Sequence, residues 1–200
     1  MPTANRRAIL IATTNAGKLR EIREILSDLP IEILSLADVA TLPEPEETGR
    51  TFAENARLKA AYYACATALP VVGEDSGLEI DALDGAPGIE SARFPGATYP
   101  EKFNRLYAML DARGGRESTA RFVCALALLQ DGTVLFETEA TVEGHIAPEP
   151  RGSGGFGYDP IFYYPAYGRT LGEASAEEKA AVSHRGKAFR ALRHFLAAHP

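Results

Sequence analysis

The sequence has no long hydrophobic segment, and this absence excludes a class of protein. No stretch approaches the roughly 20 consecutive apolar residues of a membrane-spanning helix. The apolar run near the start, Ala8 to Ala12, is too short for the hydrophobic region of a signal peptide. We therefore expect a cytoplasmic protein without a membrane partner.

Positive charge is also in short supply. The chain has 21 lysines and arginines against 27 aspartates and glutamates, a formal net charge of −6. No broad basic surface is available, which argues against general binding of nucleic acid or of anionic membranes. Any phosphate-bearing ligand must be met by a few placed cations, so we expect a small, concentrated site.

Only two cysteines are present, Cys65 and Cys124, without the spacing of a metal site. A single long-range disulfide is one option. Two thiols buried in the core, in a reducing compartment, fit better, because both cysteines have apolar, alanine-rich neighbours.

What the sequence does have is an ordinary globular composition, 46% hydrophobic and 24% charged over 200 residues. One compact domain with a substantial core is therefore expected. Strands are predicted at 8–12, 31–36, 71–73, 120–129, 134–142 and 161–164, and helices at 19–26, 51–68, 100–112, 174–181 and 185–198. This order mixes strand–helix–strand units with a long hairpin, so the expected fold class is α/β, a mixed sheet flanked by helices.

A loop of small polar residues follows the first strand, with the sequence Thr13-Thr14-Asn15-Ala16-Gly17-Lys18. Backbone N–H groups and the dipole of the following helix would face an anion there, and Lys18 adds a full positive charge. The loop is not a Walker motif, of which only Gly17-Lys18 is present. An ordinary strand-to-helix connection, capped by Thr or Asn, explains the pattern equally well.

Two pairs of adjacent carboxylates form a second candidate site. Glu46-Glu47 lie in a predicted loop, and Glu74-Asp75 stand where we expect a strand to stop. Burying such acids together is costly unless a cation neutralises them. Mg²⁺ suits them, because it prefers oxygen ligands and is commonly held by one or two carboxylates plus substrate phosphates. Solvated turn acids remain an equally good explanation.

The glycine-rich segment 152–157 matches the pattern G-x-G-x-x-G, but Pro160 and the aromatic residues after it prevent the helix that a dinucleotide site needs. Glycines would instead let the backbone approach a flat ligand. Phe156 offers a stacking face, and Asp159 could accept a hydrogen bond from a base. A flexible turn with a buried Phe is the alternative.

Further cations could complete such a site. Lys179 and the pair His184-Arg185 supply hydrogen-bond donors near the C-terminus. Lys59, on the second predicted helix, could reach the phosphate-binding loop, although taken alone a solvated helix lysine is the better explanation.

Taken together, these segments resemble the inosine triphosphate pyrophosphatase family over nearly the whole chain. The matching blocks occur in that family's order, and they are ATTNAGK at 12–18, EETG at 46–49 with Phe52, EN at 54–55, LKA at 58–60, EDSGL at 74–78, GAPG at 85–88, SAR at 91–93, GGFGYDP at 154–160, EK at 178–179 and SHRG at 183–186.

The resemblance implies an elongated α/β fold with two lobes, a single domain over 1–200, and a nucleotide bound in a central cleft. It also implies a homodimer and a reaction that needs Mg²⁺. The reaction would hydrolyse non-standard purine triphosphates (ITP, dITP and XTP) to the monophosphate and pyrophosphate, which removes them from the nucleotide pool.

The resemblance also assigns roles to single residues. Asp75 would be the general base and a Mg²⁺ ligand, with Glu46 as a second ligand. The substrate would be bound by Thr13, Thr14, Asn15, Ala16, Gly17, Lys18 and Lys59 at the triphosphate, by Ser76, and by Phe156, Gly157, Tyr158 and Asp159 at the base, with Lys179, His184 and Arg185 closing over it.

Base choice follows from hydrogen-bonding groups. Asp159 and Arg185 could pair with a ring N–H and a 6-keto group, which adenine lacks, while guanine would have to be excluded by its 2-amino group. Two positions depart from the family pattern: Glu74 stands where several relatives have Asp, and Thr14 where some have Gly.

Two other functions fit parts of the pattern. One is a related pyrophosphatase that acts on pyrimidine or other modified triphosphates. The other is a nucleotide-binding sensor without turnover, although a sensor has no use for the clustered acids at 46, 47, 74 and 75.

Overall fold

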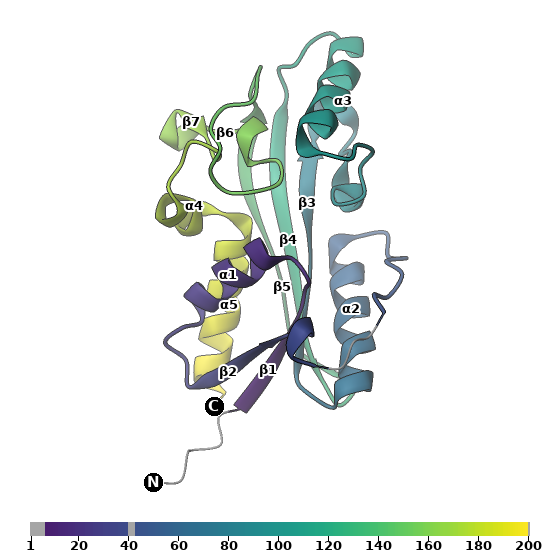
Figure 1. The fold of residues 1–200 in the computed structure, drawn as a ribbon, viewed down its shortest axis with the longest axis vertical. Coiled ribbons are helices and arrows are strands. Elements are labelled where there is room, and N and C mark those ends of the chain that lie inside the picture. Colours follow the sequence, from purple (N-terminus) through teal and green to yellow (C-terminus); the bar gives the residue numbers. More distant parts are fainter. Residues whose placement is uncertain (1–6, 40–42, 200) are drawn as a thin grey trace. The chain divides into compact units, whose positions relative to one another are not determined.

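A computed structural model, which describes residues 7–39 and 43–199, contains a seven-stranded mixed sheet and five α-helices within those residues (Figure 1). The strand order is β2-β1-β3-β4-β5-β6-β7. The predicted α/β class with a mixed sheet is confirmed. The strands are β1 (Arg7–Ala12), β2 (Ile31–Ser35), β3 (Val71–Ile80), β4 (Thr119–Gln130), β5 (Thr133–Ile146), β6 (Phe162–Tyr164) and β7 (Arg169–Thr170); the helices are α1 (Ala16–Ile25), α2 (Phe52–Thr67), α3 (Tyr99–Ala112), α4 (Ala176–Val182) and α5 (His184–Ala198).

The chain divides into two compact units. Unit 1 consists of Met1–Asp75, Cys124–Ala140 and Gly186–Pro200, and unit 2 consists of Ser76–Val123 and Thr141–Arg185. The long strands β3, β4 and β5 each contribute residues to both units.

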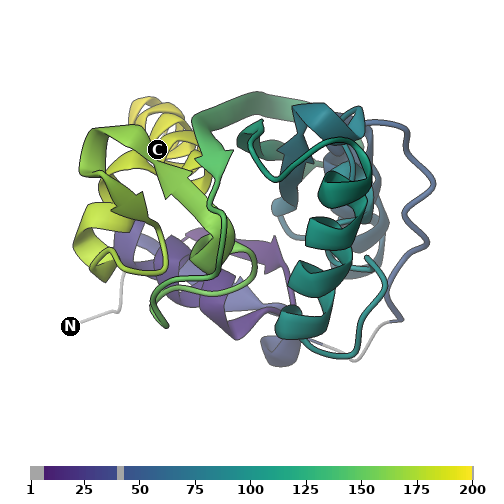
Figure 2. The same ribbon diagram turned by 90° about the horizontal axis from the view of Figure 1, so that it is seen from above.

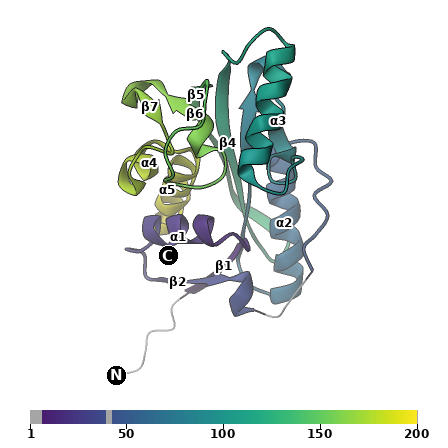
Figure 3. The same cartoon turned by 45° about the horizontal axis from the view of Figure 1, so that its top comes forward.

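Unit 1 is built on parallel strands, since β1 pairs in parallel with both β2 and β3. Side chains of β1 alternate between two faces. Ile9 and Ile11 join a core formed with side chains of α1 and α5, and Leu10 between them is also fully buried. Figures 1 and 3 show α2 on the opposite side of these strands from α1 and α5.

Helix α2 packs unusually closely against β3. A Cβ atom on Gly73 of β3 would lie 2.0 Å from the carbonyl oxygen of Ala56 and 2.7 Å from the backbone nitrogen of Ala60, both in α2. Only glycine on the strand and small residues on the helix allow this approach. The helix begins where predicted, because the Thr51 hydroxyl accepts a hydrogen bond from the backbone N–H of Glu54.

Unit 2 has its own core, between α3 and the strands. Phe103 and Leu106 of α3 pack with Leu78 of β3, Phe122 of β4 and Phe162 of β6. Figure 2 shows α3 in teal across from β6 and β7 in green. The burial of these side chains stabilises unit 2, because each large apolar side chain contributes about 1.5–3 kcal/mol.

Two sequence predictions were wrong. The strand expected to stop before Glu74-Asp75 continues through both acids as β3, which ends at Ile80. Cys65, expected in the core, is exposed on α2, whereas Cys124 is buried as predicted, and the two cysteines are not joined in a disulfide. In the part of the chain that the structure describes, no helix is long and apolar enough to cross a membrane.

Candidate functional site

The turn from β1 into α1 forms the first part of the site (Figure 3). The pairing of β1 with β3 ends at Ala12 opposite Gly73. Asn15 then caps α1, its Oδ1 accepting the backbone N–H of Lys18 at 3.0 Å. Thr14, Asn15 and Ala16 are exposed, so solvent reaches this helix N-terminus, and the binding of an anion by the segment 13–18 stays a prediction.

Next to this turn lie the two acids of β3. The Lys18 Nζ lies 3.4 Å from Oε1 of Glu74, a side chain that is 1% exposed. The Cys124 thiol donates to the same oxygen at 3.7 Å. As neighbours in a strand, Glu74 and Asp75 point to opposite faces, so Lys18 contacts Glu74 directly while its charge also acts on Asp75.

On its own face, Asp75 is held by two side chains of α2. Asn55 Nδ2 donates to Oδ2 of Asp75 at 3.0 Å. Lys59 Nζ donates to Oδ1 of the same carboxylate at 3.2 Å, and to the backbone oxygen of Glu74 at 3.2 Å. Because residues four apart share a helix face, the close packing of α2 on β3 delivers both donors together.

The acidic loop before α2 supplies a third carboxylate to this cluster. Glu47 forms an ion pair with the Lys59 ammonium, which therefore stands between Glu47 and Asp75. Glu46, the residue expected to bind metal, is exposed on the same loop. The structure thus brings Glu47 to Lys59 and Asp75, and the role of Glu46 stays a prediction.

Burial and charge set the protonation of this cluster. Burial raises the pKa of Asp75 above its ordinary value, and Lys59, Asn55 and Lys18 oppose that rise without cancelling it. For Lys59, burial acts to lower the pKa, but the charges of Asp75 and Glu47 outweigh it and raise the pKa. A carboxylate with a raised pKa is a better proton acceptor, which suits a general base.

A second group of predicted residues gathers in unit 2, at the loop before β6. The buried carboxylate of Asp159 organises this loop. Its Oδ2 accepts the backbone N–H of Phe156 at 2.8 Å and the ammonium of Lys179 at 2.7 Å. Gly155 lies under the same oxygen with φ +67°. Asp159 therefore holds the loop and Lys179 in place.

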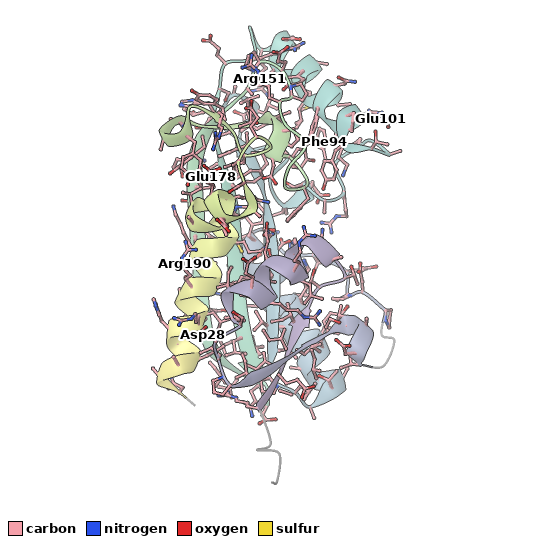
Figure 4. The ribbon with its side chains drawn as sticks, turned by 60° about the vertical axis from the view of Figure 1, so that its left-hand side comes forward. Asp28, Phe94, Glu101, Arg151, Glu178 and Arg190 are labelled. Carbon is pink, nitrogen blue, oxygen red and sulfur yellow. The ribbon has the colours of Figure 1, made fainter. Side chains whose placement is uncertain are left out.

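The Phe156 ring lies beside two buried cations. Lys179 Nζ lies 4.1 Å from the ring centroid, and the Arg185 guanidinium carbon lies 5.3 Å from it. Arg185 also donates to the Ser76 hydroxyl at 3.2 Å, while the His184 ring stacks on Phe122 with centroids 4.9 Å apart. Helix α4, which carries Lys179, starts with a capping box to which Glu178, labelled in Figure 4, contributes.

Tyr158 differs from its neighbours in the loop. Its side chain is buried in unit 2, its ring meets Tyr99 edge-on, and its hydroxyl donates to the backbone oxygen of Ser91 at 2.8 Å. Burial, together with the nearby Tyr99, raises its pKa. The phenol therefore anchors the loop to the core of unit 2. The backbone of Tyr158 is the part of this residue that is left for a ligand.

Sequence reasoning missed Asn55 as a member of the site. It is fully buried in the first turns of α2, where a polar side chain without a partner would be costly. Its position four residues before Lys59 is the signal that could have revealed it, since the two must share one helix face.

Comparison with known proteins gives one consistent result. A model described as the Ham1 family matches residues 9–195. A dITP/XTP pyrophosphatase of Thermus thermophilus is 51% identical over 185 residues, which cover 92% of this chain and 89% of the relative. A dITP/XTP pyrophosphatase of an Exiguobacterium species is 46% identical over 184 residues, covering 92% and 94%.

Solved structures agree with the sequences. A HAM1 protein from Coxiella burnetii superimposes with a TM-score of 0.89 at 41% identity, over 96% of this chain and 99% of that one. The Staphylococcus aureus Ham1 protein matches with a TM-score of 0.86 at 36% identity, over 97% and 100%.

Proposed function

The chain belongs to the Ham1 family, and from this premise we propose that it is a nucleoside triphosphate pyrophosphatase acting on ITP, dITP and XTP. Water would cleave the bond between the α and β phosphates, giving the nucleoside monophosphate and pyrophosphate. The enzyme would thereby remove non-standard purine nucleotides from the nucleotide pool. Work in the cytoplasm and assembly as a homodimer are parts of the proposal that rest on family resemblance.

The single observation that carries this proposal is the arrangement around Asp75. A buried carboxylate with a raised pKa is held through both oxygens by Asn55 and Lys59. Such a group can take the proton of an attacking water, and a fixed carboxylate does so without first having to reorient. The proton released by the water thus ends on Asp75 before it passes to solvent.

The triphosphate would be bound by the cations of unit 1. The exposed N-terminus of α1 offers backbone N–H groups, and the Lys18 and Lys59 ammonium groups lie on either side of the acids of β3. They would offset the charge that grows on the phosphate oxygens as the bond breaks. The net charge of −6 makes these few cations the more important.

Mg²⁺ fits the oxygen donors of this cluster. Asp75 and Glu46 would hold it, with Glu47 on the same loop. Among residues 7–39 and 43–199, no three His, Cys, Asp or Glu side chains form a ready metal site. This suits a cation held by one or two carboxylates together with the phosphates of the substrate. When bound, Mg²⁺ would supply electrostatic stabilisation of the negative phosphoryl oxygens.

Preference among bases would follow from the donors in unit 2. The side chains of Lys179 and Arg185 carry hydrogen-bond donors and no acceptor. Hypoxanthine and xanthine present a 6-keto oxygen to such donors, and xanthine adds a 2-keto oxygen. Adenine at position 6 and guanine at position 2 present amino groups instead, which would leave donor facing donor. Asp159, whose Oδ2 is occupied by Phe156 and Lys179, would act by holding these donors.

The test is pyrophosphate release from a panel of ITP, dITP, XTP, ATP, GTP and dUTP. We expect fast turnover of the first three and slow turnover of the rest. Equal rates on all purine triphosphates would reject the specificity, and preference for dUTP would favour a pyrimidine enzyme. Binding without any turnover would identify a sensor.

The same assay tests the general base. Asp75→Asn keeps the size of the side chain and removes the proton acceptor, so turnover should fall at least about a hundredfold while ITP still binds. Asp111→Asn, which breaks an exposed ion pair with Arg116, is the control and should turn over ITP normally. Near-normal turnover in Asp75→Asn would remove Asp75 from the role.

A further inference from the structure

Asn55 is completely buried, and its amide is used in two directions. Its Oδ1 accepts the backbone N–H of Gly49 at 2.8 Å, in the loop that carries Glu46 and Glu47. Its Nδ2 donates to Oδ2 of Asp75 at 3.0 Å. One side chain therefore connects the acidic loop to the proposed base.

The orientation of this amide follows from its partners. A backbone N–H can only donate, so the end of the Asn55 amide that faces Gly49 must be the oxygen. The NH₂ end is then left to face Asp75. A Cβ atom on Gly49 would lie 2.5 Å from the Asn55 oxygen, so position 49 has no room for a side chain.

Lys59, one helical turn further along α2, repeats the pattern. It donates to the other oxygen of Asp75 and pairs with Glu47 of the same loop. Each oxygen of the Asp75 carboxylate is thus held by a different side chain of α2, and each of those side chains also holds the loop. With both oxygens held, the carboxylate is fixed in one orientation about its Cβ–Cγ bond.

We propose that Asn55 is a positioning residue for the reaction, which fixes the rotation of the Asp75 carboxylate relative to the acidic loop. This inference rests on the proposed function, in which Asp75 is the base. Lys59 has a charge to offer the substrate, whereas Asn55 is neutral and fully buried, so it acts on the reaction through the Asp75 carboxylate. Without the Asn55 donor, Oδ2 of Asp75 loses its buried partner and the carboxylate can rotate away from the attacking water.

Asn55→Asp is the sharpest test. The variant keeps the shape of the side chain and the oxygen that accepts from Gly49, and it replaces the donor that faces Asp75 with a second carboxyl oxygen, which either repels the Asp75 carboxylate or shares a proton with it. We expect kcat for ITP to fall at least about tenfold, with KM changed by less than about threefold, because misplacing a reacting group lowers the rate rather than the affinity.

Asn55→Ala separates the two hydrogen bonds. It removes both, so kcat should fall by a similar factor, and in addition the backbone amide of Gly49 should exchange its hydrogen faster. In Asn55→Asp the Gly49 amide should stay protected. This hydrogen-exchange measurement does not depend on substrate or metal. If Asn55→Asp does not fold, the kcat and KM of Asn55→Ala, compared with those of the control below, decide the case.

Glu54→Ala is the matched control. Glu54 lies next to Asn55, is exposed, and accepts the backbone N–H of Arg50 in the same loop at 2.6 Å. Its removal loosens the loop and the helix start without touching Asp75. We expect kcat in Glu54→Ala to stay within about twofold of the wild type.

The outcomes are distinct. A wild-type enzyme that turns over no triphosphate defeats the proposed function. If the wild type is active, a normal kcat in Asn55→Asp overturns the positioning role. The same conclusion follows if Asn55→Asp raises KM instead of lowering kcat, or if kcat falls as much in Glu54→Ala as in Asn55→Ala.

Discussion

At the scale of single residues, Gly155 shows how one backbone position supports a buried ion pair. It has φ +67°, and an added Cβ would lie 2.1 Å from Oδ2 of Asp159, the oxygen that binds Lys179. Gly155→Ala would force Asp159 away and leave Lys179 buried without its partner oxygen. We expect a loss of about 3 kcal/mol in the free energy of unfolding, measured with urea.

Gly132→Ala is the control for this prediction. Gly132 has a similar φ, +74°, but an added Cβ would have nothing within 4 Å. This variant carries the backbone strain alone, so it should lose only about 1 kcal/mol. Equal losses in the two variants would show that the contact with Asp159 contributes nothing.

Tyr107 gives a prediction about pH. Its buried hydroxyl donates to the backbone oxygen of Ala147 at 3.0 Å, and burial raises its pKa to about 12 from 10. The folded state therefore holds this proton more tightly than the unfolded chain. The stabilising contribution is complete below pH 10 and is lost as the pH rises from 10 through 12, by roughly 2–3 kcal/mol.

Urea unfolding between pH 8 and 11.5 measures this loss. In Tyr107→Phe the free energy of unfolding should be about 1 kcal/mol lower at pH 8, because a hydrogen bond is missing. Its decline above pH 10 should be shallower than in the wild type. A decline as steep as that of the wild type would mean that Tyr107 is not the group that titrates.

Sequence alone predicted residue types better than side-chain directions. Lys59 and Asp75 were expected to act together, and they lie in contact. The local pattern could not tell Glu46 from Glu47, because neighbouring residues in an extended loop point to different sides. The family resemblance placed Tyr158 at the base without saying where its side chain points, and the structure shows its hydroxyl donating to the Ser91 carbonyl in the core.

At the scale of elements, the approach of α2 to β3 decides where Asn55 and Lys59 lie. Gly73→Ala would place a methyl group 2.0 Å from a backbone oxygen of α2, which cannot yield as a side chain could. The helix must then move. We expect a loss of at least about 3 kcal/mol in the free energy of unfolding. We also expect a lower kcat in the protein that remains folded.

The control for Gly73→Ala is a change on the outer face of the same helix. Ala61 is exposed, so Ala61→Leu should leave both the unfolding free energy and kcat nearly unchanged. If Gly73→Ala behaves like Ala61→Leu, the close packing of α2 is not what positions the site.

The helices and most strands could be predicted because their apolar spacing is local. The continuation of β3 through Glu74 and Asp75 could not, because two adjacent acids do not look like a buried strand. They are tolerated there because Lys18, from a turn far away in sequence, and Lys59, from another helix, neutralise them. Their partners are therefore a tertiary feature. The two-residue strand β7 was also missed, since it is too short to show any period.

At the scale of the whole molecule, the family could be predicted because its motifs are distributed along the entire chain. The family model covers residues 9–195, and relatives near 50% identity cover more than nine-tenths of the sequence. The proposed use of Mg²⁺ is different, because the proposed site combines side chains with phosphates of the substrate and so leaves a weaker pattern in the sequence.

A protein of net charge −6 must bind a polyanion, which favours a cation that arrives with the substrate. The described residues contain no group of three metal-ligating side chains, so Mg²⁺ should bind weakly to the protein alone.

EDTA should abolish pyrophosphate release from ITP, and excess Mg²⁺ should restore it. The melting temperature of the free protein should not respond to Mg²⁺. In the wild type, Mg²⁺ and a non-hydrolysable ITP analogue together should add stabilisation, and Asp75→Ala, which lacks a proposed ligand, should lose it. Turnover that persists in EDTA would contradict the metal requirement, and a large melting shift with Mg²⁺ alone would show that the protein holds the ion without substrate.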